Sequence, residues 1–172
     1  MIVSLDDLKA QITTTLPDDV LISKLAAIEQ LVRNYTHNNF RVRNRRMTGK
    51  IEGGKIALPF SFLKVGDTVD ISESVLNDGT YEVAEVSGST VTLSEDLLDE
   101  KHALVSLVRY PADVQQGAIN LMKWDLENRD KVGIASETIS RHSVTYFDLG
   151  KDNTANGFPD VLIGFLKPYK KV

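Results

Sequence analysis

The stretch from Asp18 to His37 has the spacing of an amphipathic helix. Its apolar residues recur at alternating steps of four and three, which places them on one helical face. Pro17 and Asp18 provide a start signal, and Asn38 and Asn39 tolerate the left-handed backbone that ends a helix. A helix of about twenty residues spans about 30 Å, the width of a small domain. We therefore expect other elements to cover this face.

Candidate partners for this helix lie on both sides of it in sequence. A short amphipathic pattern follows Ser4, and a broad apolar face runs from Pro111 to Lys131. Gly117 lies inside the second pattern, where glycine costs about 1 kcal/mol relative to alanine. We expect Gly117 to allow close approach of the Asp18–His37 helix, and Trp124 to be a core or interface residue.

The middle of the chain changes to a period of two. Between Lys50 and Arg109, short alternating runs of apolar residues are separated by turn signals such as Gly53-Gly54 and Asn77-Asp78-Gly79. About five short strands at this spacing favour a small barrel or a curled sheet.

The combined pattern predicts an α+β fold. We expect a small antiparallel helical bundle formed by residues 1–50 and 106–172, with an inserted β-rich, barrel-like module at residues 51–105 and a short C-terminal helix. This C-terminal helix is marginal alone, so it must pack on a partner.

Charge follows the same division. The net charge of the 172 residues is −4. Eight Lys/Arg against five Asp/Glu give +3 in residues 1–50, three against eleven give −8 in residues 51–105, and nine against eight give +1 in residues 106–172. The net negative charge of the middle segment argues against nucleic-acid binding by that segment.

One basic run precedes this acidic segment. The sequence RVRNRRMTGK contains Arg41, Arg43, Arg45 and Arg46 without an acidic residue. It can be a phosphate-binding patch, a surface for a carboxylate-rich protein partner, or a solvated edge strand. No stacking aromatic residues are interleaved with the arginines, which weakens the nucleic-acid interpretation.

Residues that would support catalysis are not arranged in known motifs. The chain has no phosphate-binding loop, dinucleotide-binding glycine fingerprint, His-Glu-x-x-His or Gly-x-Ser-x-Gly motif. It has no cysteine, and its three histidines lack ligand spacing. We therefore expect a protein that is not an enzyme and uses no cofactor or metal. No apolar run is long enough to cross a bilayer, so we expect no membrane association.

Both flanks of the chain resemble a family of viral assembly proteins. The motifs are S-L-D-D-L-K, the helix D-x-x-L-x-x-x-x-x-A-x-x-x-I leading to Y-T-H-N-N-F, then S-E-T-I-S-R-H-S-V-T-Y and F-P-D-V-L-I-G-F-L-K-P-Y. Their order and spacing resemble the head–tail connector, or adaptor, proteins of tailed bacteriophages. The resemblance covers roughly residues 1–40 and 110–172, and the strand-rich middle departs from the smallest members of the family.

The resemblance implies a structural role in the neck of the virion, after synthesis in the cytoplasm of the bacterial host. It implies a homo-oligomeric ring, commonly of twelve copies, that binds the portal protein above and a neck or tail-completion protein below. DNA would pass transiently through the ring, where the four arginines could contact DNA or a neighbouring subunit. The family's C-terminal docking element maps here onto the apolar positions of the last helix: Phe158, Leu162, Phe165, Leu166 and Tyr169.

Three alternatives stay open at this point. The chain could be a nucleic-acid-binding module that uses the Arg41–Arg46 patch. It could be a neighbouring neck or tail-completion protein. The C-terminal helix could also only close the protein's own core, without docking on a portal.

Overall fold

The computed structural model describes residues 1–128, 136–139, 142–145, 154–155 and 157–171. Within them the chain divides into two compact units. One unit contains Met1 and residues 38–110, and we call it the barrel unit. The other contains residues 2–37 and 111–172, and we call it the helical unit. The barrel unit extends beyond the predicted module of residues 51–105 at both ends.

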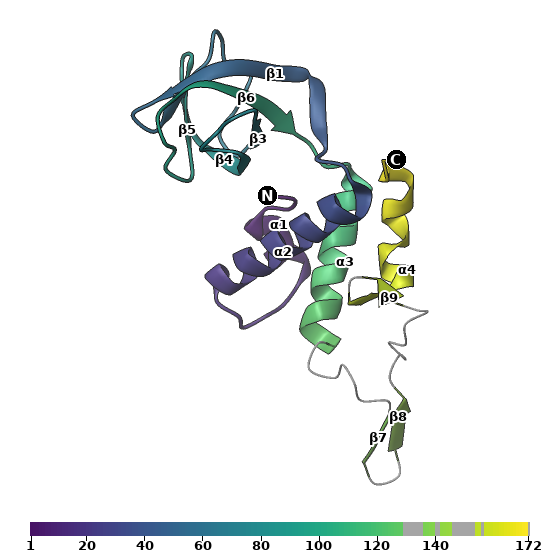
Figure 1. Ribbon diagram of the computed structural model, residues 1–172. Coiled ribbons are helices and arrows are strands. Elements are labelled where there is room, and N and C mark those ends of the chain that lie inside the picture. Colours follow the sequence, from purple (N-terminus) through teal and green to yellow (C-terminus); the bar gives the residue numbers. More distant parts are fainter. Residues whose placement is uncertain (129–135, 140–141, 146–153, 156, 172) are drawn as a thin grey trace. The chain divides into compact units, whose positions relative to one another are not determined.

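Six antiparallel strands of the barrel unit form a closed barrel (Figure 1). Their order around the barrel is β1-β2-β5-β4-β3-β6, and β6 pairs with β1 to close it. The strands are β1 (Arg41–Glu52), β2 (Lys55–Ala57), β3 (Thr68–Ser72), β4 (Gly79–Ser87), β5 (Thr90–Leu93) and β6 (Glu100–Val108).

The barrel has its own hydrophobic core. Alternate residues of the strands point inward, as the pleat requires. The buried side chains are almost all aliphatic: Ile51, Ile56, Leu58, Leu63, Val69, Ile71, Val83, Val91, Leu93, Leu97, Ala103, Val105 and Leu107. These residues form one contiguous cluster made entirely of barrel-unit residues.

The fold class predicted from the sequence is therefore wrong. We expected a small helical bundle with an inserted β-rich module, whereas the closed six-stranded barrel dominates the fold. The error has a physical cause in β1, whose first eight residues alternate poorly because most of them are exposed. This polar segment belongs to the barrel because β1 pairs with β6, and its own sequence pattern does not indicate that pairing.

The chain enters and leaves the barrel at one place. The backbone N–H of Arg109 donates to the carbonyl of Phe40 at 3.0 Å. The rings of Phe40 and Tyr110 pack with their centroids 4.9 Å apart. The first and last residues of the barrel unit are thereby held next to each other.

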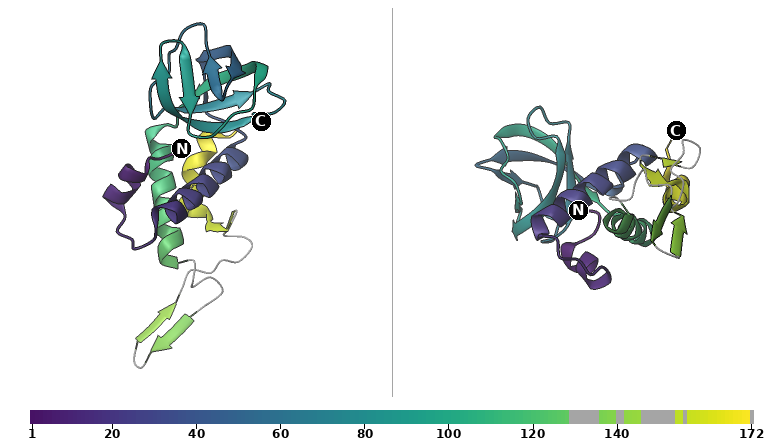
Figure 2. Two further views of the ribbon diagram at one scale, coloured as in Figure 1. Left: turned by 90° about the vertical axis from the view of Figure 1, so that its left-hand side faces the viewer. Right: turned by 90° about the horizontal axis from the view of Figure 1, so that it is seen from below.

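The helical unit contains α1 (Leu5–Gln11), α2 (Asp18–Thr36), α3 (Ala112–Asn128), α4 (Asp160–Ile163) and the 3-10 helix η2 (Gly164–Tyr169). Two short antiparallel pairs accompany them: β7 (Ser136–Ile139) with β8 (His142–Thr145), and β9 (Thr154–Ala155) with β10 (Phe158–Pro159). Both views of Figure 2 show α2, α3 and the C-terminal α4 side by side, and α2, α3 and η2 contact one another pairwise.

The expected pairing of α2 with α3 is confirmed. Leu21, Leu25 and Val32 of α2 are completely buried, as are Leu121 and Met122 of α3. A partly buried ion pair also joins the two helices, with 2.6 Å between Lys24 Nζ and Asp125 Oδ2.

Gly117 does allow a close approach, as expected, but the approaching element is not the predicted α2. A Cβ atom at Gly117 would lie 2.2 Å from Cζ of Phe165, a residue of η2 rather than of α2. The ring of Phe165 occupies the space that a side chain would need. The missing side chain on α3 thus makes room for the C-terminal segment.

Gly117→Ala should destabilise the helical unit by about 1–3 kcal/mol, because the Phe165 ring must move from its packed position. Gly164→Ala is the matched control, since its Cβ would meet nothing within 4 Å and its backbone is already helical. Thermal melting should fall for the first variant and stay or rise for the second. Equal melting of the two would contradict the packing of Phe165 on Gly117.

Candidate functional site

The predicted arginine patch lies on the first half of β1, at the edge of a surface hollow. The hollow has a volume of about 360 Å³. It is lined by Val42, Asn44, Arg45, Phe62, Lys64, Asp67, Leu107 and Arg109. We call this feature the basic hollow, because three cationic side chains and one carboxylate surround its apolar base.

A bulge in β1 creates the hollow. Arg41 lies opposite Val108 and Arg46 lies opposite Ser106, so four residues of β1 face a single residue of β6. Extra residues in one strand bend it away from its partner. The bulged residues 42–45 therefore stand off the barrel, and Leu107 of β6 lies at the base of the space beneath them.

The four arginines differ in their surroundings. Arg41 Nε lies 2.6 Å from Oδ2 of Asp70, whose side chain is only 6% exposed. Arg43, Arg45 and Arg46 are exposed, and none of them lies within ion-pair distance of an acidic side chain in the described part of the chain. Arg41 therefore stabilises the fold, whereas the other three are available to a partner.

The opposite end of the barrel is acidic. Two loops meet there: residues 73–78 between β3 and β4, and residues 94–99 between β5 and β6. Together they carry five acidic residues and no Lys or Arg. They also expose three aliphatic side chains, with Val75 89% exposed, Leu98 60% and Leu76 57%. We call these two loops the acidic tip.

Hydrogen bonds to Asn77 and Glu100 hold the acidic tip together. Asn77 is 4% exposed, its Oδ1 accepts from the N–H of Leu98 at 2.8 Å, and its Nδ2 donates to the Leu98 carbonyl at 3.0 Å. The Glu100 carboxylate accepts from the Ser74 hydroxyl, from the Val75 N–H at 2.7 Å and from Asn77 Nδ2 at 2.9 Å. The two loops are thus tied to each other and to β6.

Titratable groups report the same arrangement. The hydrogen bond from Ser74 and that from the Val75 N–H lower the pKa of Glu100, because they favour its charged form. Burial raises the pKa of Tyr81, and the negative charges of Glu95 and Asp78 raise it further.

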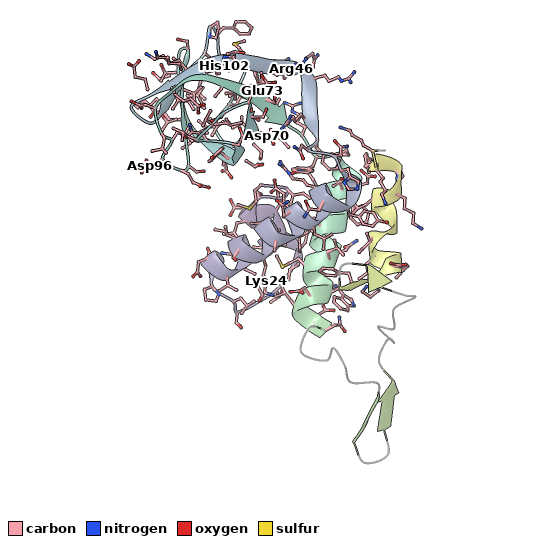
Figure 3. All side chains as sticks on the ribbon, viewed as in Figure 1. Lys24, Arg46, Asp70, Glu73, Asp96 and His102 are labelled. Atoms are coloured by element: carbon pink, nitrogen blue, oxygen red, sulfur yellow. The ribbon has the colours of Figure 1, made fainter. Side chains whose placement is uncertain are left out.

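The strand register places the basic hollow and the acidic tip at opposite ends of the barrel. The Gly53 N–H, just beyond the end of β1, donates to Asp99 Oδ1 at 2.7 Å, which ties the acidic tip to the far end of that strand. Figure 3 shows Arg46 and Asp96 at opposite ends of the barrel. The eight steps along the backbone from Arg45 to Gly53 would span up to about 26 Å if fully extended.

The predicted C-terminal docking residues divide into two groups. Phe158 and Leu166 are buried in the helical unit, at 5% and 0% exposure, and Phe158 packs against Trp124 with 5.4 Å between ring centroids. Leu162, Phe165 and Tyr169 are half-buried. Leu166, one of the expected docking residues, thus belongs to the core of the helical unit.

Tyr169 is also held within the helical unit. Its hydroxyl donates to the Asp113 carboxylate at 2.8 Å, and this hydrogen bond raises the pKa of Tyr169. The burial of the segment favours the alternative in which it closes the protein's own core. Val161, at 78% exposure, is its most accessible apolar residue.

Sequence reasoning found the arginines but not their surroundings. The sequence pattern does not indicate that Lys64 and Arg109 lie beside the patch, and it predicts for Asn77 only a place in a turn. The adjacent apolar residues Val75 and Leu76 beside that turn were the available signal, since exposed turns rarely place two aliphatic residues together.

The described residues offer no evident metal site, since they contain no cluster of three His, Asp or Glu side chains suited to an ion. No helix among them is both long enough and apolar enough to cross a membrane. No family model and no curated protein matches the chain.

Arg41→Gln should destabilise the barrel by about 1–2 kcal/mol, because the buried Asp70 carboxylate loses a charged partner, while solvent screening of the half-exposed arginine limits the effect. The same change at Arg43, Arg45 or Arg46 should stay within about 0.5 kcal/mol of the parent chain. Urea denaturation of the four variants measures the difference. Equal stability of all four would refute a distinct role for Arg41.

Acid should loosen the acidic tip before the rest of the barrel. A carboxyl with a lowered pKa stabilises the fold at pH values above its ordinary pKa, which is 4.5 for Glu100. This contribution declines below that pH and is lost as the pH falls through the lowered value. Hydrogen-exchange protection of the Val75 N–H should fall in this range. Glu100→Gln should lower the protection already at pH 7, whereas Glu95→Gln, the control, should not.

Proposed function

We propose that the protein is a structural head–tail connector of a tailed bacteriophage, which forms a ring beneath the portal. One observation carries the proposal. The two flanks that carry the resemblance, far apart in sequence, come together in the helical unit, while the divergent middle forms the barrel unit. This division supports the view that the two flanks together form the unit that corresponds to the connector family.

The individual motifs also coincide with elements of the helical unit. S-L-D-D-L-K covers the start of α1, with the Ser4 hydroxyl accepting from the Asp7 N–H at 3.1 Å. S-E-T-I and H-S-V-T are the two strands of the β7–β8 pair. F-P-D-V-L-I-G-F-L-K-P-Y covers β10, α4 and η2. Residues 140, 141 and 146 of the connector motif lie outside the described residues.

The proposed partners are the portal protein, a downstream neck or tail-completion protein, and further copies of this chain, with twelve in the virion. The role is assembly in the neck of the virion, without catalysis and without a cofactor. DNA passing through the ring would meet exposed arginines as loose electrostatic contacts, which neutralise phosphate charge without reading sequence.

The C-terminal segment must use its exposed side if it docks on the portal. Phe158 packs on Trp124 of α3 and Leu166 is fully buried, so neither residue can contact a partner at the same time. The exposed Val161, the half-buried Leu162 and the exposed Lys167 provide an apolar and cationic surface. An acidic apolar rim on the portal would suit this surface.

Electron microscopy of the purified protein mixed with the portal of the phage that encodes it tests the proposal. We expect an added ring on one side of the portal. Val161→Asp combined with Lys167→Glu should abolish the added ring without changing the melting temperature, because both residues are exposed. Ile22→Asp is the control, as it places the same charge at an exposed apolar residue of α2.

Two outcomes would count against parts of this proposal. A parent chain that never joins portal rings would refute the connector function. A double variant that joins as well as the parent would refute only the docking surface.

A nucleic-acid-binding module is the second candidate, and the basic hollow favours it. Arg45, Lys64 and Arg109 surround a hollow that also contains the ring of Phe62, so cations and an aromatic residue are brought together. Salt-dependent DNA binding with sub-micromolar affinity at physiological ionic strength would favour this candidate, since non-specific contacts give only about 10⁻⁴–10⁻⁶ M.

A further inference from the structure

The two ends of the barrel are complementary to each other. The acidic tip presents five carboxylates around exposed aliphatic side chains, whereas the basic hollow presents cations around an apolar base. Both features belong to the barrel unit, and the strand register places them at its opposite ends. Each end therefore has a suitable partner in the other end of a second copy.

We propose that copies of this chain join head to tail through their barrels, with the acidic tip of one copy docked on the basic hollow of the next. The occupant of the hollow is thus a second copy of the same protein.

Charge selects this arrangement over a symmetric pair. Two acidic tips would repel each other, and so would two basic hollows, whereas a tip facing a hollow gains attraction on contact. Among the residues that the structure describes, Asp67 supplies the single carboxylate that lines the hollow, and its Oδ2 already accepts from the Lys64 N–H at 2.8 Å. The exposed Arg43 and Arg46 extend the cationic rim beyond the hollow.

Apolar contact supplies the second part of the fit. Val75, Leu76 and Leu98 project from the acidic tip with more than half of each side chain exposed. The hollow has a base of Leu107 with Val42 and Phe62 beside it. Its volume of about 360 Å³ lies within the range of sites that enclose small ligands, about 300–1,000 Å³, so aliphatic side chains can enter it.

The acidic tip is also pre-organised for binding. Asn77 and Glu100 fix both loops by hydrogen bonds before any partner arrives. A surface that is already ordered loses little conformational entropy on association. The hydrogen bonds of the Asn77 amide and the Glu100 carboxylate therefore keep these two surface loops in a conformation suited to binding.

A head-to-tail contact has a consequence for assembly. Such a contact leaves one unused tip and one unused hollow at the ends of every oligomer, so it continues until the series closes into a ring or extends as a filament. That the series closes as the seam of a connector ring rests on the proposed function. The contact itself rests only on the two ends of the barrel.

A mixing experiment with two variants tests the contact. The tip variant carries Val75→Lys and Leu98→Lys, and the hollow variant carries Arg45→Glu and Lys64→Glu. Each variant keeps one intact end. Analytical ultracentrifugation at low salt should show concentration-dependent association of the parent chain, and at least about tenfold weaker association of each variant alone, equivalent to about 1.4 kcal/mol.

The mixture of the two variants gives the decisive result. The intact tip of the hollow variant should bind the intact hollow of the tip variant, so the mixture should form heterodimers and stop there. Added salt should weaken these heterodimers, because it screens exposed charges. Glu85→Lys on β4 and Lys123→Glu on α3, both exposed and outside the two ends of the barrel, are the control variants and should associate like the parent.

Three results would overturn the contact: a parent chain that stays monomeric at millimolar concentration, a tip variant that associates like the parent, or a mixture without heterodimers. Melting curves of every variant establish that the barrel is folded. Failure of the mixture while the parent still joins portal rings would remove only the barrel contact. Pairing in the mixture without portal binding would instead leave the contact and remove the connector function.

Discussion

The pairing of β1 with β6 is the interaction on which the barrel depends, because it converts a curled sheet into a closed one. Closure removes both sheet edges, which would otherwise expose unpaired backbone groups to other chains. It also sets the positions of the basic hollow and the acidic tip. The bulge opposite Leu107 forms the hollow at one end of this pair, and Glu100, the first residue of β6, anchors the tip at the other. A single strand pair therefore supports two surfaces with opposite charge.

Asp70 and Asn77, two buried polar residues of the barrel, have bonding partners, whereas most charged groups of the barrel lie at its surface. Asp70 is buried with Arg41 beside it, and Asn77 is buried with both of its amide atoms engaged. Buried polar groups of this kind cost free energy unless they are paired, so their positions are tightly specified. The other charged residues of the barrel are exposed or half-buried, so they do not occupy the core. The acidic balance of the middle segment is thus concentrated where it leaves the core intact and remains accessible to a partner.

The sequence predicted the helices well and the barrel incompletely. The period of α2 comes from its own residues, so its bounds follow from the pattern to within one residue. Residues 46–48 of β1 pair with β6, whereas residues 42–45 bulge away from it, and a polar run reveals neither arrangement in advance. Gly117 was correctly associated with a close approach, but its neighbour Phe165 lies 48 residues further along the chain, beyond any local pattern. The arginine patch was visible as composition, whereas the Asp70 partner of Arg41 and the hollow beside Arg45 depend on strand register.

The junction at Phe40 and Tyr110 has a consequence for the order of folding. Residues 38–110 separate the two halves of the helical unit by 73 positions, and closing a flexible loop of that length carries an entropic cost. A barrel that folds first brings its two ends together and leaves an effective loop of only a few residues. That shortening equals about four halvings of loop length, or roughly 2.5 kcal/mol of closure entropy at about 0.6 kcal/mol each. A barrel that is already folded would therefore speed the docking of α3 on α2, because it shortens the loop between them.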